Sequence, residues 1–270
     1  MKKILFLLLI SPICLFSQNY QYERIVSYHS DLEVQQNCDV IVTETIKVYA
    51  GGSQIQRGIF RDLPLSYNYK GGNVKVGFKL LDIKRDGKPE PHHTEWMSNG
   101  IRIYIGDADI YLSSGFYTYE IKYRVDHVLG IYEEYDEIYW NINGNGWGFS
   151  IDSISARVIF PKEAKYIQHD GYTGYYGSTD KNFTTEVDGN TVLYAGTESL
   201  NSEENLSVAV AWEKGHLIYP TAMDNFWFWV KSYILWVIGI VALIIGFAHN
   251  FVMWYKYGRD PKPGTIIPRY

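Results

Sequence analysis

Apolar and polar residues alternate along much of the chain between residues 20 and 215. Residues 117–126, YTYEIKYRVD, have tyrosine, isoleucine or valine at every second position and threonine or charged residues between them. Residues 206–213, LSVAVAWE, repeat this pattern. A period of two puts the apolar side chains on one face of an extended chain, so both segments predict half-buried β-strands. Further strands are expected at residues 22–29, 39–49, 74–83, 101–105, 136–142, 149–160 and 191–195.

Turn-forming stretches separate the expected strands. They are rich in glycine, asparagine and aspartate and include AGGSQ, YKGGN, KRDGKP, NGNG and DGYTGYYGS. We find no amphipathic helical pattern of useful length in this region. Many short strands joined by such turns favour an all-β fold, an antiparallel β-sandwich that occupies residues 19–220.

Residues 139–151, YWNINGNGWGFSI, combine two tryptophans with an Asn-Gly turn signal. We interpret them as a β-hairpin whose GNG turn tolerates positive φ. Trp140 shares a strand face with Ile138 and Ile142 and is therefore expected in the core. One alternative is that Trp140 and Trp147 form an aromatic platform for a glycan.

A cluster of carboxylates just upstream suggests a second alternative, a glycosidase pair. Glycosidases need two carboxylates held at a fixed separation across the scissile bond. Here the acidic residues crowd a single segment, which is more typical of a solvated edge or loop. The cluster comprises Glu133, Glu134, Asp136 and Glu137.

One carboxylate breaks the alternation of residues 38–48, CDVIVTETIKV. Glu44 falls on the face of Val42 and Ile46, where an apolar residue is expected. Either the strand lies at a sheet edge and Glu44 reaches water, or Glu44 is buried and must then have a cationic partner. The nearest candidates are Arg57 and Arg61, because a guanidinium can bind a carboxylate through two hydrogen bonds. A catalytic Glu44 is disfavoured because no second carboxylate stands opposite.

Apolar segments lie on both sides of the expected β domain. Residues 1–18 combine two lysines, a short apolar run and small or polar residues, which is the pattern of a cleaved secretory signal peptide. Residues 232–254 contain no lysine, arginine, aspartate or glutamate, and as a helix they would span roughly 30 Å or slightly more. Aromatic residues crowd both ends, so a transmembrane helix with an aromatic flank is predicted at residues 226–254. Residues 255–270 follow as a cytoplasmic segment.

The distribution of charged residues indicates the orientation of the chain in the membrane and the classes of partner that the β domain can bind. Basic residues after the helix place the C-terminal side in the cytoplasm by the positive-inside rule. The β domain is therefore expected outside the cytoplasm, with the helix in the plasma (inner) membrane. Removing the two charges of the leader and the net three of the tail from the formal charge of −5 leaves −10 for the rest. A domain this acidic is a poor binder of nucleic acid. The basic residues are Lys256, Arg259, Lys262 and Arg269.

The sequence offers no signal for a cofactor, a metal or a catalytic residue. His92 and His93 are adjacent and have no partners at the spacing of zinc ligands. GNGWG does not open a helix as a dinucleotide fingerprint does, and GDAD lacks the further carboxylates of a calcium loop.

Five blocks of the sequence carry a resemblance to a known family. They are VIVTETIKV, RGIFRDLPL, IYIGDADIYLSSGFYTYEIKYRV, DEIYWNINGNGWGFSIDSISARVIFP and YGRDPKPGTIIPRY. In the same order, they resemble blocks of a family of predicted bacterial membrane proteins, the domain-of-unknown-function family that includes the YciQ-type proteins. The likeness covers residues 20–270 and implies an exported β domain, a transmembrane helix and a cytoplasmic stretch leading to further membrane segments beyond this sequence. No activity, cofactor or catalytic residue comes with it.

Two functions from different classes are therefore expected. The first is a membrane-anchored cell-envelope protein whose β domain is a scaffold or binds another envelope protein. The alternative is a domain that binds or processes a glycan. Clustered aromatic residues over a groove would favour a sugar, and a bare sheet edge would favour a protein.

Overall fold

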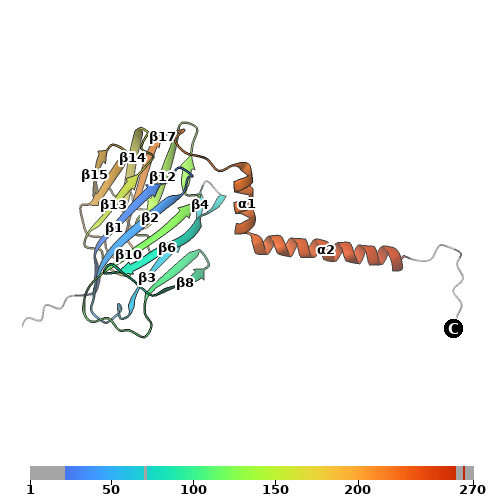
Figure 1. The fold of residues 1–270 in the computed structure, drawn as a ribbon, viewed down its shortest axis with the longest axis horizontal. Coiled ribbons are helices and arrows are strands. Elements are labelled where there is room, and N and C mark those ends of the chain that lie inside the picture. The colour runs from blue at the N-terminus through green and yellow to red at the C-terminus, as the bar shows by residue number, and fades with distance from the viewer. Residues whose placement is uncertain (1–21, 70–71, 260–263, 265–270) are drawn as a thin grey trace, which may run out of the picture. The chain divides into compact units, whose positions relative to one another are not determined.

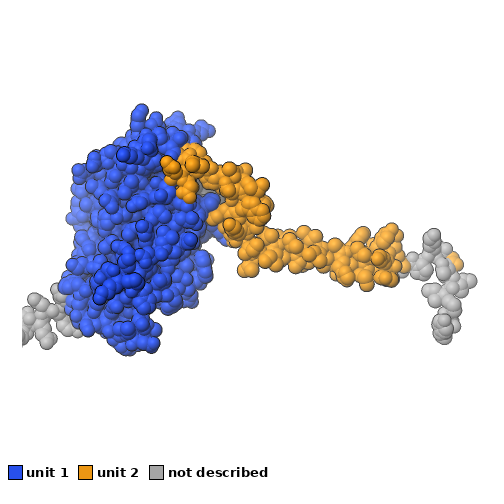
Figure 2. Space-filling model, viewed as in Figure 1, with its two compact units in different colours: residues 1–35, 39–216 blue, residues 36–38, 217–270 orange. Residues whose placement is uncertain are grey.

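The computed structural model describes residues 22–69, 72–259 and 264. It divides into two compact units, coloured separately in Figure 2. The first holds residues up to 35 and 39–216, and the second holds residues 36–38 and those from 217 onward. The expected signal peptide at residues 1–18 lies outside the described residues, as do Lys262 and Arg269 of the expected cytoplasmic tail.

The first unit is built on an eight-stranded sheet with the order β15-β16-β13-β1-β2-β10-β6-β7 (Figure 1). Its neighbouring strands pair antiparallel except β1 and β13, which run parallel. The strands are β1 (Arg24–Val34), β2 (Val40–Ala50), β6 (Gly77–Arg85), β7 (Lys88–Pro89), β10 (Gly115–Asp126), β13 (Ile154–Ile159), β15 (Phe183–Asp188) and β16 (Thr191–Gly196).

Three smaller sheets complete the unit. A four-stranded sheet has the order β11-β12-β17-β14, a three-stranded sheet the order β3-β9-β8, and β4 pairs with β5. Their strands are β3 (Gly58–Pro64), β4 (Ser66–Tyr69), β5 (Gly72–Lys75), β8 (His92–Met97), β9 (Gly100–Gly106), β11 (Leu129–Ile131), β12 (Tyr135–Asn141), β14 (Tyr166–Gly174) and β17 (Asn205–Glu213).

The core lies between one face of the large sheet and the inner faces of the four-stranded and three-stranded sheets. The rings of Phe160, which follows β13, and Trp212 of β17 stack at 5.8 Å with an interplanar angle of 3°. From β16, Tyr194 donates a hydrogen bond to the backbone oxygen of Ala209 on β17 (2.8 Å). Burying each large side chain of this kind stabilises the fold by roughly 1.5–3 kcal/mol.

The all-β character of this unit is confirmed, and most strands lie where the alternation predicted them. The prediction of a β-hairpin at residues 139–151 is wrong. β12 pairs with β11 and β17, whereas β13 pairs with β1 and β16, so the segment between them crosses from one sheet to another. An Asn-Gly turn signal specifies where the chain bends but not which strands pair afterwards.

The second unit contains the helices. α1 (Ala222–Ser232) and α2 (Ile234–Tyr257) are separated by Tyr233, whose φ of −122° and ψ of 24° are not helical. α2 is long and apolar enough to cross a membrane, and none of its residues is buried. The transmembrane helix expected at 226–254 is therefore present as a shorter span that begins later. In the same unit, the Sγ of Cys38 donates to the backbone oxygen of Ile218 (3.5 Å).

Glu23 fixes the loop that follows β2. Its carboxylate accepts hydrogen bonds from four backbone N–H groups at distances of 2.6–3.1 Å. Desolvation by burial acts to raise the pKa of Glu23, but the four donors outweigh it and hold the pKa below the ordinary value of 4.5. The donors belong to Gly51, Ser53, Gln54 and Ile55.

The lowered pKa of Glu23 predicts an acid-sensitive contribution to stability. The contribution is fully present above 4.5 and is lost as the pH falls through the lower pKa of the folded state. Glu23→Gln should therefore lower the urea midpoint of the full chain in detergent at neutral pH, and the difference from wild type should shrink as the pH falls below 4.5. Glu186→Gln, which changes an exposed carboxylate, is the control. A difference for Glu23→Gln that stays constant across this range would contradict the prediction.

Candidate functional site

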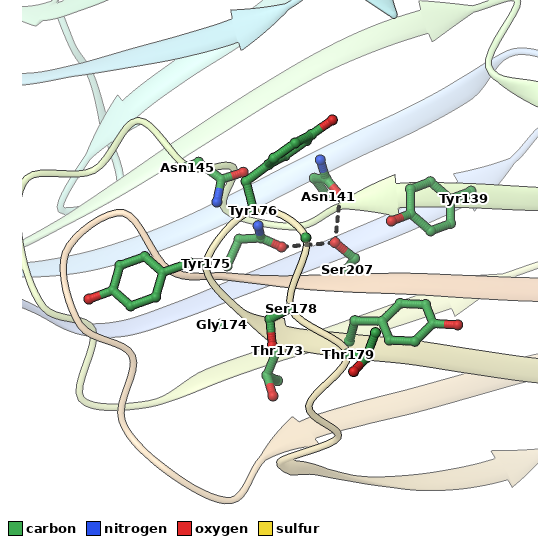
Figure 3. A pocket seen from close by; sticks show the side chains of 13 residues that line it. Tyr139, Asn141, Asn145, Thr173, Gly174, Tyr175, Tyr176, Ser178, Thr179 and Ser207 are labelled. Carbon is green, nitrogen blue, oxygen red and sulfur yellow. Dashed lines mark hydrogen bonds between the residues drawn. The ribbon is translucent and has the colours of Figure 1, made fainter. Parts of the chain in front are cut away.

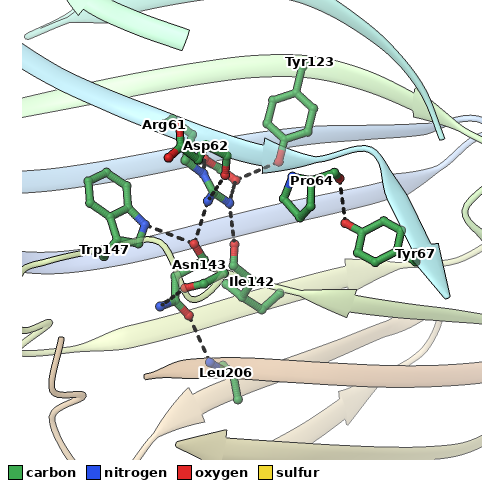
Figure 4. A network of polar contacts seen from close by, with 11 residues as sticks. Arg61, Asp62, Pro64, Tyr67, Tyr123, Ile142, Asn143, Trp147 and Leu206 are labelled. Atoms are coloured by element: carbon green, nitrogen blue, oxygen red, sulfur yellow. Dashed lines mark hydrogen bonds and ion pairs between the residues drawn. The ribbon is translucent and has the colours of Figure 1, made fainter. Parts of the chain in front are cut away.

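Glu44 and Arg61 form an ion pair in the core. The pair belongs to a network of polar contacts in which Figure 4 labels Arg61, Tyr123 and Asn143. Glu44 lies on β2, a central strand of the large sheet, and Arg61 lies on β3 of the three-stranded sheet. Arg61 Nε donates to Glu44 Oε2 and Nη2 donates to Oε1, both at 2.9 Å. Tyr123 donates to the same Oε1 at 2.7 Å. Glu44 is fully buried and Arg61 is 2% exposed, so the structure has the buried pair and not the exposed edge.

The pair explains how a carboxylate remains in the core. Burial alone would lower the pKa of Arg61, but the adjacent Glu44 carboxylate outweighs it and raises that pKa above its ordinary value. Burial raises the pKa of Tyr123, so its hydroxyl remains a hydrogen-bond donor. Removing one member of such a pair leaves an uncompensated buried charge, which costs about 3–5 kcal/mol.

Arg61 also binds the segment that was expected to be a hairpin. Its Nη1 donates to the backbone oxygen of Asn143 (2.7 Å), and its Nη2 donates to that of Ile142 (3.3 Å). The Asn143 side chain then reaches β17, because Oδ1 accepts from Leu206 N (3.0 Å) and Nδ2 donates to Glu204 O (2.8 Å). The guanidinium thus connects all three main sheets.

The segment between β12 and β13 has a glycine where it passes close to the Arg61 guanidinium. Gly144 has a φ of +69°, and a Cβ at this position would stand 3.3 Å from Arg61 Nη1. A side chain there would therefore be strained and would crowd the guanidinium. Trp147 donates from Nε1 to the same Asn143 oxygen (3.1 Å). Trp140 and Trp147 are each 6% exposed, so neither offers a ring face to a glycan. The alternative prediction that these two residues form an aromatic platform is therefore wrong.

Arg57 is not part of the network. Its guanidinium lies 4.1 Å from the ring centroid of Tyr111, to whose hydroxyl it also donates a hydrogen bond. The acidic cluster does not form a glycosidase pair within β12, because Asp136 and Glu137 are adjacent on the strand and point to opposite faces. Burial raises the pKa of Glu137.

A pocket of about 380 Å³ opens on the outer face of the four-stranded sheet (Figure 3). Its floor comes from one row across the sheet, in which Asn141 of β12 stands opposite Ser207 of β17, and Ser207 stands opposite Tyr172 of β14. Asn205, Tyr139 and Asn145 extend this floor. A rim is added by the turn after β14, namely Gly174, Tyr175, Tyr176, Gly177, Ser178 and Thr179, with Thr173 at its base.

The rim is a tight turn that exposes two aromatic rings. Thr173 N donates to Asp180 O (2.7 Å) and Ser178 N donates to Tyr175 O (2.9 Å), which close the turn. Gly174 permits it with a φ of +110°. Tyr176 is 94% exposed and Tyr175 is 56% exposed, so both present apolar surface to a ligand at little further cost in desolvation.

The floor holds hydrogen-bonding groups that the protein does not fully use. Ser207 Oγ lies 2.6 Å from Asn141 Oδ1 and 2.8 Å from Asn205 Oδ1, but one hydroxyl proton serves one acceptor well. The side-chain nitrogens of Asn141 and Asn205 have no hydrogen-bond partner in the described part of the chain. None of the 13 described lining residues carries a charge. The pocket therefore suits a neutral ligand rich in donors and acceptors.

A histidine, a serine and an aspartate also meet on the outer face of the large sheet. His29 Nδ1 lies 2.7 Å from Ser155 Oγ, and Nε2 lies 3.0 Å from Asp31 Oδ1. Asp31 also accepts from Arg157 (2.7 Å). β1 is paired with β2 on one side and β13 on the other, so the backbone around the trio is engaged in ladders, unlike an oxyanion hole. We interpret the trio as a surface hydrogen-bond network.

Sequence reasoning identified Glu44 and Arg61 but missed the pocket. The stretch DGYTGYYGS was assigned only as a turn, although its three tyrosines among glycines were a visible signal. Asn141 and Ser207 are 66 residues apart, so no spacing rule joins them.

Comparison with known proteins identifies the family. The sequence model of the family described as "Predicted membrane protein (DUF2207) N-terminal domain" matches residues 24–212. The chain belongs to this family of membrane proteins, which confirms the resemblance to YciQ-type proteins. It is 30% identical over 194 residues to "Uncharacterized protein YciQ" of Escherichia coli (strain K12), a match that covers 68% of this chain and 31% of YciQ.

Two solved structures show weak similarity. Yeast LTA4 hydrolase has a TM-score of 0.45 at 10% identity, over 72% of this chain and 29% of the hydrolase. An M1 zinc metallopeptidase from Deinococcus radiodurans has a TM-score of 0.38 at 12% identity, over 69% and 42% of the respective chains. These scores are too low to support an argument about function.

The buried network predicts strong coupling between Glu44 and Arg61. Glu44→Gln and Arg61→Ala should each destabilise the full chain by about 3–5 kcal/mol, because each leaves a buried polar group without its partner. The double variant should lose much less than the sum. Asp31→Asn and Arg157→Ala, which break a part-buried pair at the surface, should each cost only about 0–1 kcal/mol. Additive losses for Glu44 and Arg61 in chemical unfolding would exclude the coupling.

Proposed function

We propose that this member of the DUF2207 family is a membrane-anchored binding protein whose β domain holds a neutral saccharide in the tyrosine–asparagine pocket. The observation that carries the proposal is the meeting of exposed tyrosine rings with uncommitted amides around a hollow of about 380 Å³. Pockets of roughly 300–1,000 Å³ are typical for small ligands.

The chemistry of the lining residues matches that of a sugar. Saccharide hydroxyls both donate and accept hydrogen bonds, and the Asn141 and Asn205 amides offer both functions. The C–H faces of a sugar ring are apolar and can pack on Tyr175 or Tyr176. A phosphate or sulfate would lose its hydration without meeting a lining cation, which is unfavourable.

A binding role is favoured over processing. Glycoside hydrolysis uses two carboxylates on either side of the bond, and the described lining residues include none. The pocket therefore supports recognition, with the membrane helix keeping the recognised saccharide near the bilayer.

A second candidate function is protein binding at the edge strand β8. All six of its residues are exposed, and β8 ends the three-stranded sheet. Its Trp96 is 72% exposed. An extended segment of another envelope protein could add to this edge by strand pairing, which is the function first expected from the sequence.

Removing the Tyr176 ring should distinguish saccharide binding in the pocket from protein binding at β8. Tyr176→Ala should weaken binding of neutral oligosaccharides by about tenfold, or about 1.4 kcal/mol, since a stacked ring is lost without disturbing the core. Asn141→Ala should weaken it through lost hydrogen bonds. Binding is measured with the full chain in phospholipid nanodiscs, because maltoside detergents would compete as sugars.

Trp96→Ala is the matched control, since it removes an exposed ring that does not line the pocket. It should bind saccharides as wild type does. Binding that is unaffected by Tyr176→Ala and Asn141→Ala, or that is stronger for uronate or sulfated glycans, would contradict the saccharide proposal. Loss of a protein partner in a pull-down with Trp96→Ala alone would favour the second candidate.

We also propose that residues 20–225 lie outside the cytoplasm and that the chain resides in the plasma (inner) membrane. The leader pattern and the basic residues after α2 support this orientation. A phosphatase fused after Lys214 should be active, and one fused after Tyr270 should be silent. The reverse pattern would contradict the orientation.

A further inference from the structure

The short helix α1 differs from the membrane span that follows it. It begins with its own capping box, in which Asp224 N donates to Thr221 Oγ1 (3.2 Å) and Thr221 N donates to Asp224 Oδ2 (2.9 Å). It ends where Tyr233 leaves the helical conformation. A helix with defined start and stop signals is a separate element and not the frayed end of α2.

The lengths of the two helices place α1 outside the hydrocarbon core. α2 has 24 residues and is about 36 Å long, which already exceeds the roughly 30 Å of a bilayer core. A continuous helix over residues 222–257 would be about 54 Å long. α1 also carries Asp224 and Lys231, whose charges are costly within the core.

α1 nevertheless has an apolar face. Met223, Phe226, Trp227 and Val230 recur at spacings of three and four, so they share one side of the helix. Asn225 and Ser232 lie on the opposite side, and Asp224 and Lys231 lie along one edge of the apolar face. Two aromatic residues, Phe228 and Trp229, also lie away from that face. No α1 residue is buried, and Met223, Phe226 and Trp227 are 61%, 52% and 53% exposed.

We propose that α1 is an interfacial helix that lies in the plane of the outer leaflet, with its apolar face among the upper acyl chains and its polar face toward water. The occupant of this face is the lipid surface, because α1 is separated by one residue from a helix that crosses the membrane. Tryptophan suits this depth, since its ring is apolar and its N–H can reach the headgroups. The anchor then has two parts: α2 spans the bilayer, and α1 lies along its surface.

Environment-sensitive labels on opposite sides of one turn test the proposal. Met223→Cys and Asn225→Cys are two residues apart, so they have nearly the same position along the helix axis but face opposite ways, and all aromatic residues remain. Ile245→Cys near the middle of α2 is the deep reference. Cys14→Ala and Cys38→Ala remove the two native thiols in all three chains.

The full chain is reconstituted in vesicles of phosphatidylethanolamine and phosphatidylglycerol that carry a nitroxide quencher at a shallow or a deep acyl position. The shallow quencher should reduce emission from the label at 223 by about twofold and leave the label at 225 nearly unchanged. The deep quencher should act on 245. Trp227→Ser should abolish the quenching at 223 and preserve it at 245.

Equal quenching at 223 and 225 by the deep quencher would overturn the proposal in favour of a span that includes α1. Unquenched emission at both positions would overturn it in favour of a helix in water. Urea unfolding of each variant, compared with wild type, separates loss of membrane contact from loss of folding. These outcomes do not depend on whether the pocket binds a saccharide.

Discussion

The fold depends on how a buried carboxylate in a central strand is neutralised. Glu44 interrupts the apolar face of β2 where water cannot reach it, so the strand can remain in the core only if a cation comes to it. Arg61 supplies that cation from another sheet, and its remaining N–H groups bind the carbonyls of Ile142 and Asn143. One guanidinium thereby sets the relative position of three sheets that share no backbone ladder.

This constraint extends to the outer surface. Asn143 transmits it to Leu206 on β17, and the pocket floor is formed by residues on either side of these two, Asn141 and Asn145 along one segment and Asn205 and Ser207 along the other. Because neighbouring positions on a strand point to opposite faces, the buried contact of Leu206 fixes the backbone from which Asn205 and Ser207 project. Among the described residues, Tyr175 and Tyr176 of the rim make no contact with this buried network. For the proposed saccharide, we therefore assign orientation to the floor and most of the apolar contact to the rim.

The sequence predicted those features that depend on local period. Alternation located most strands, an apolar run located the membrane helix, and Glu44 could be recognised because it breaks a period of two. The pairing partners of the strands could not be predicted in the same way. Residues 139–151 contain a bend, yet β12 pairs with β17 and β13 pairs with β1 and β16, and these partners are distant in sequence. The pocket could not be predicted either, since its floor joins three strands that are distant in sequence, and β14 was not expected as a strand.

The preference for neutral ligands that we propose for the pocket rests on short-range effects rather than on the net charge of the domain. The acidic excess of residues 19–254 repels anions, but salt screens that repulsion beyond roughly 8 Å under physiological conditions. Nearest to Tyr172, Asp170 and Lys181 form an ion pair, so their fields largely cancel. An anionic ligand would therefore be disfavoured mainly by losing water against uncharged amides and phenol rings, whereas a neutral polyol exchanges its water for equivalent hydrogen bonds. On the saccharide proposal, the uncharged lining therefore disfavours phosphate and costs a saccharide little.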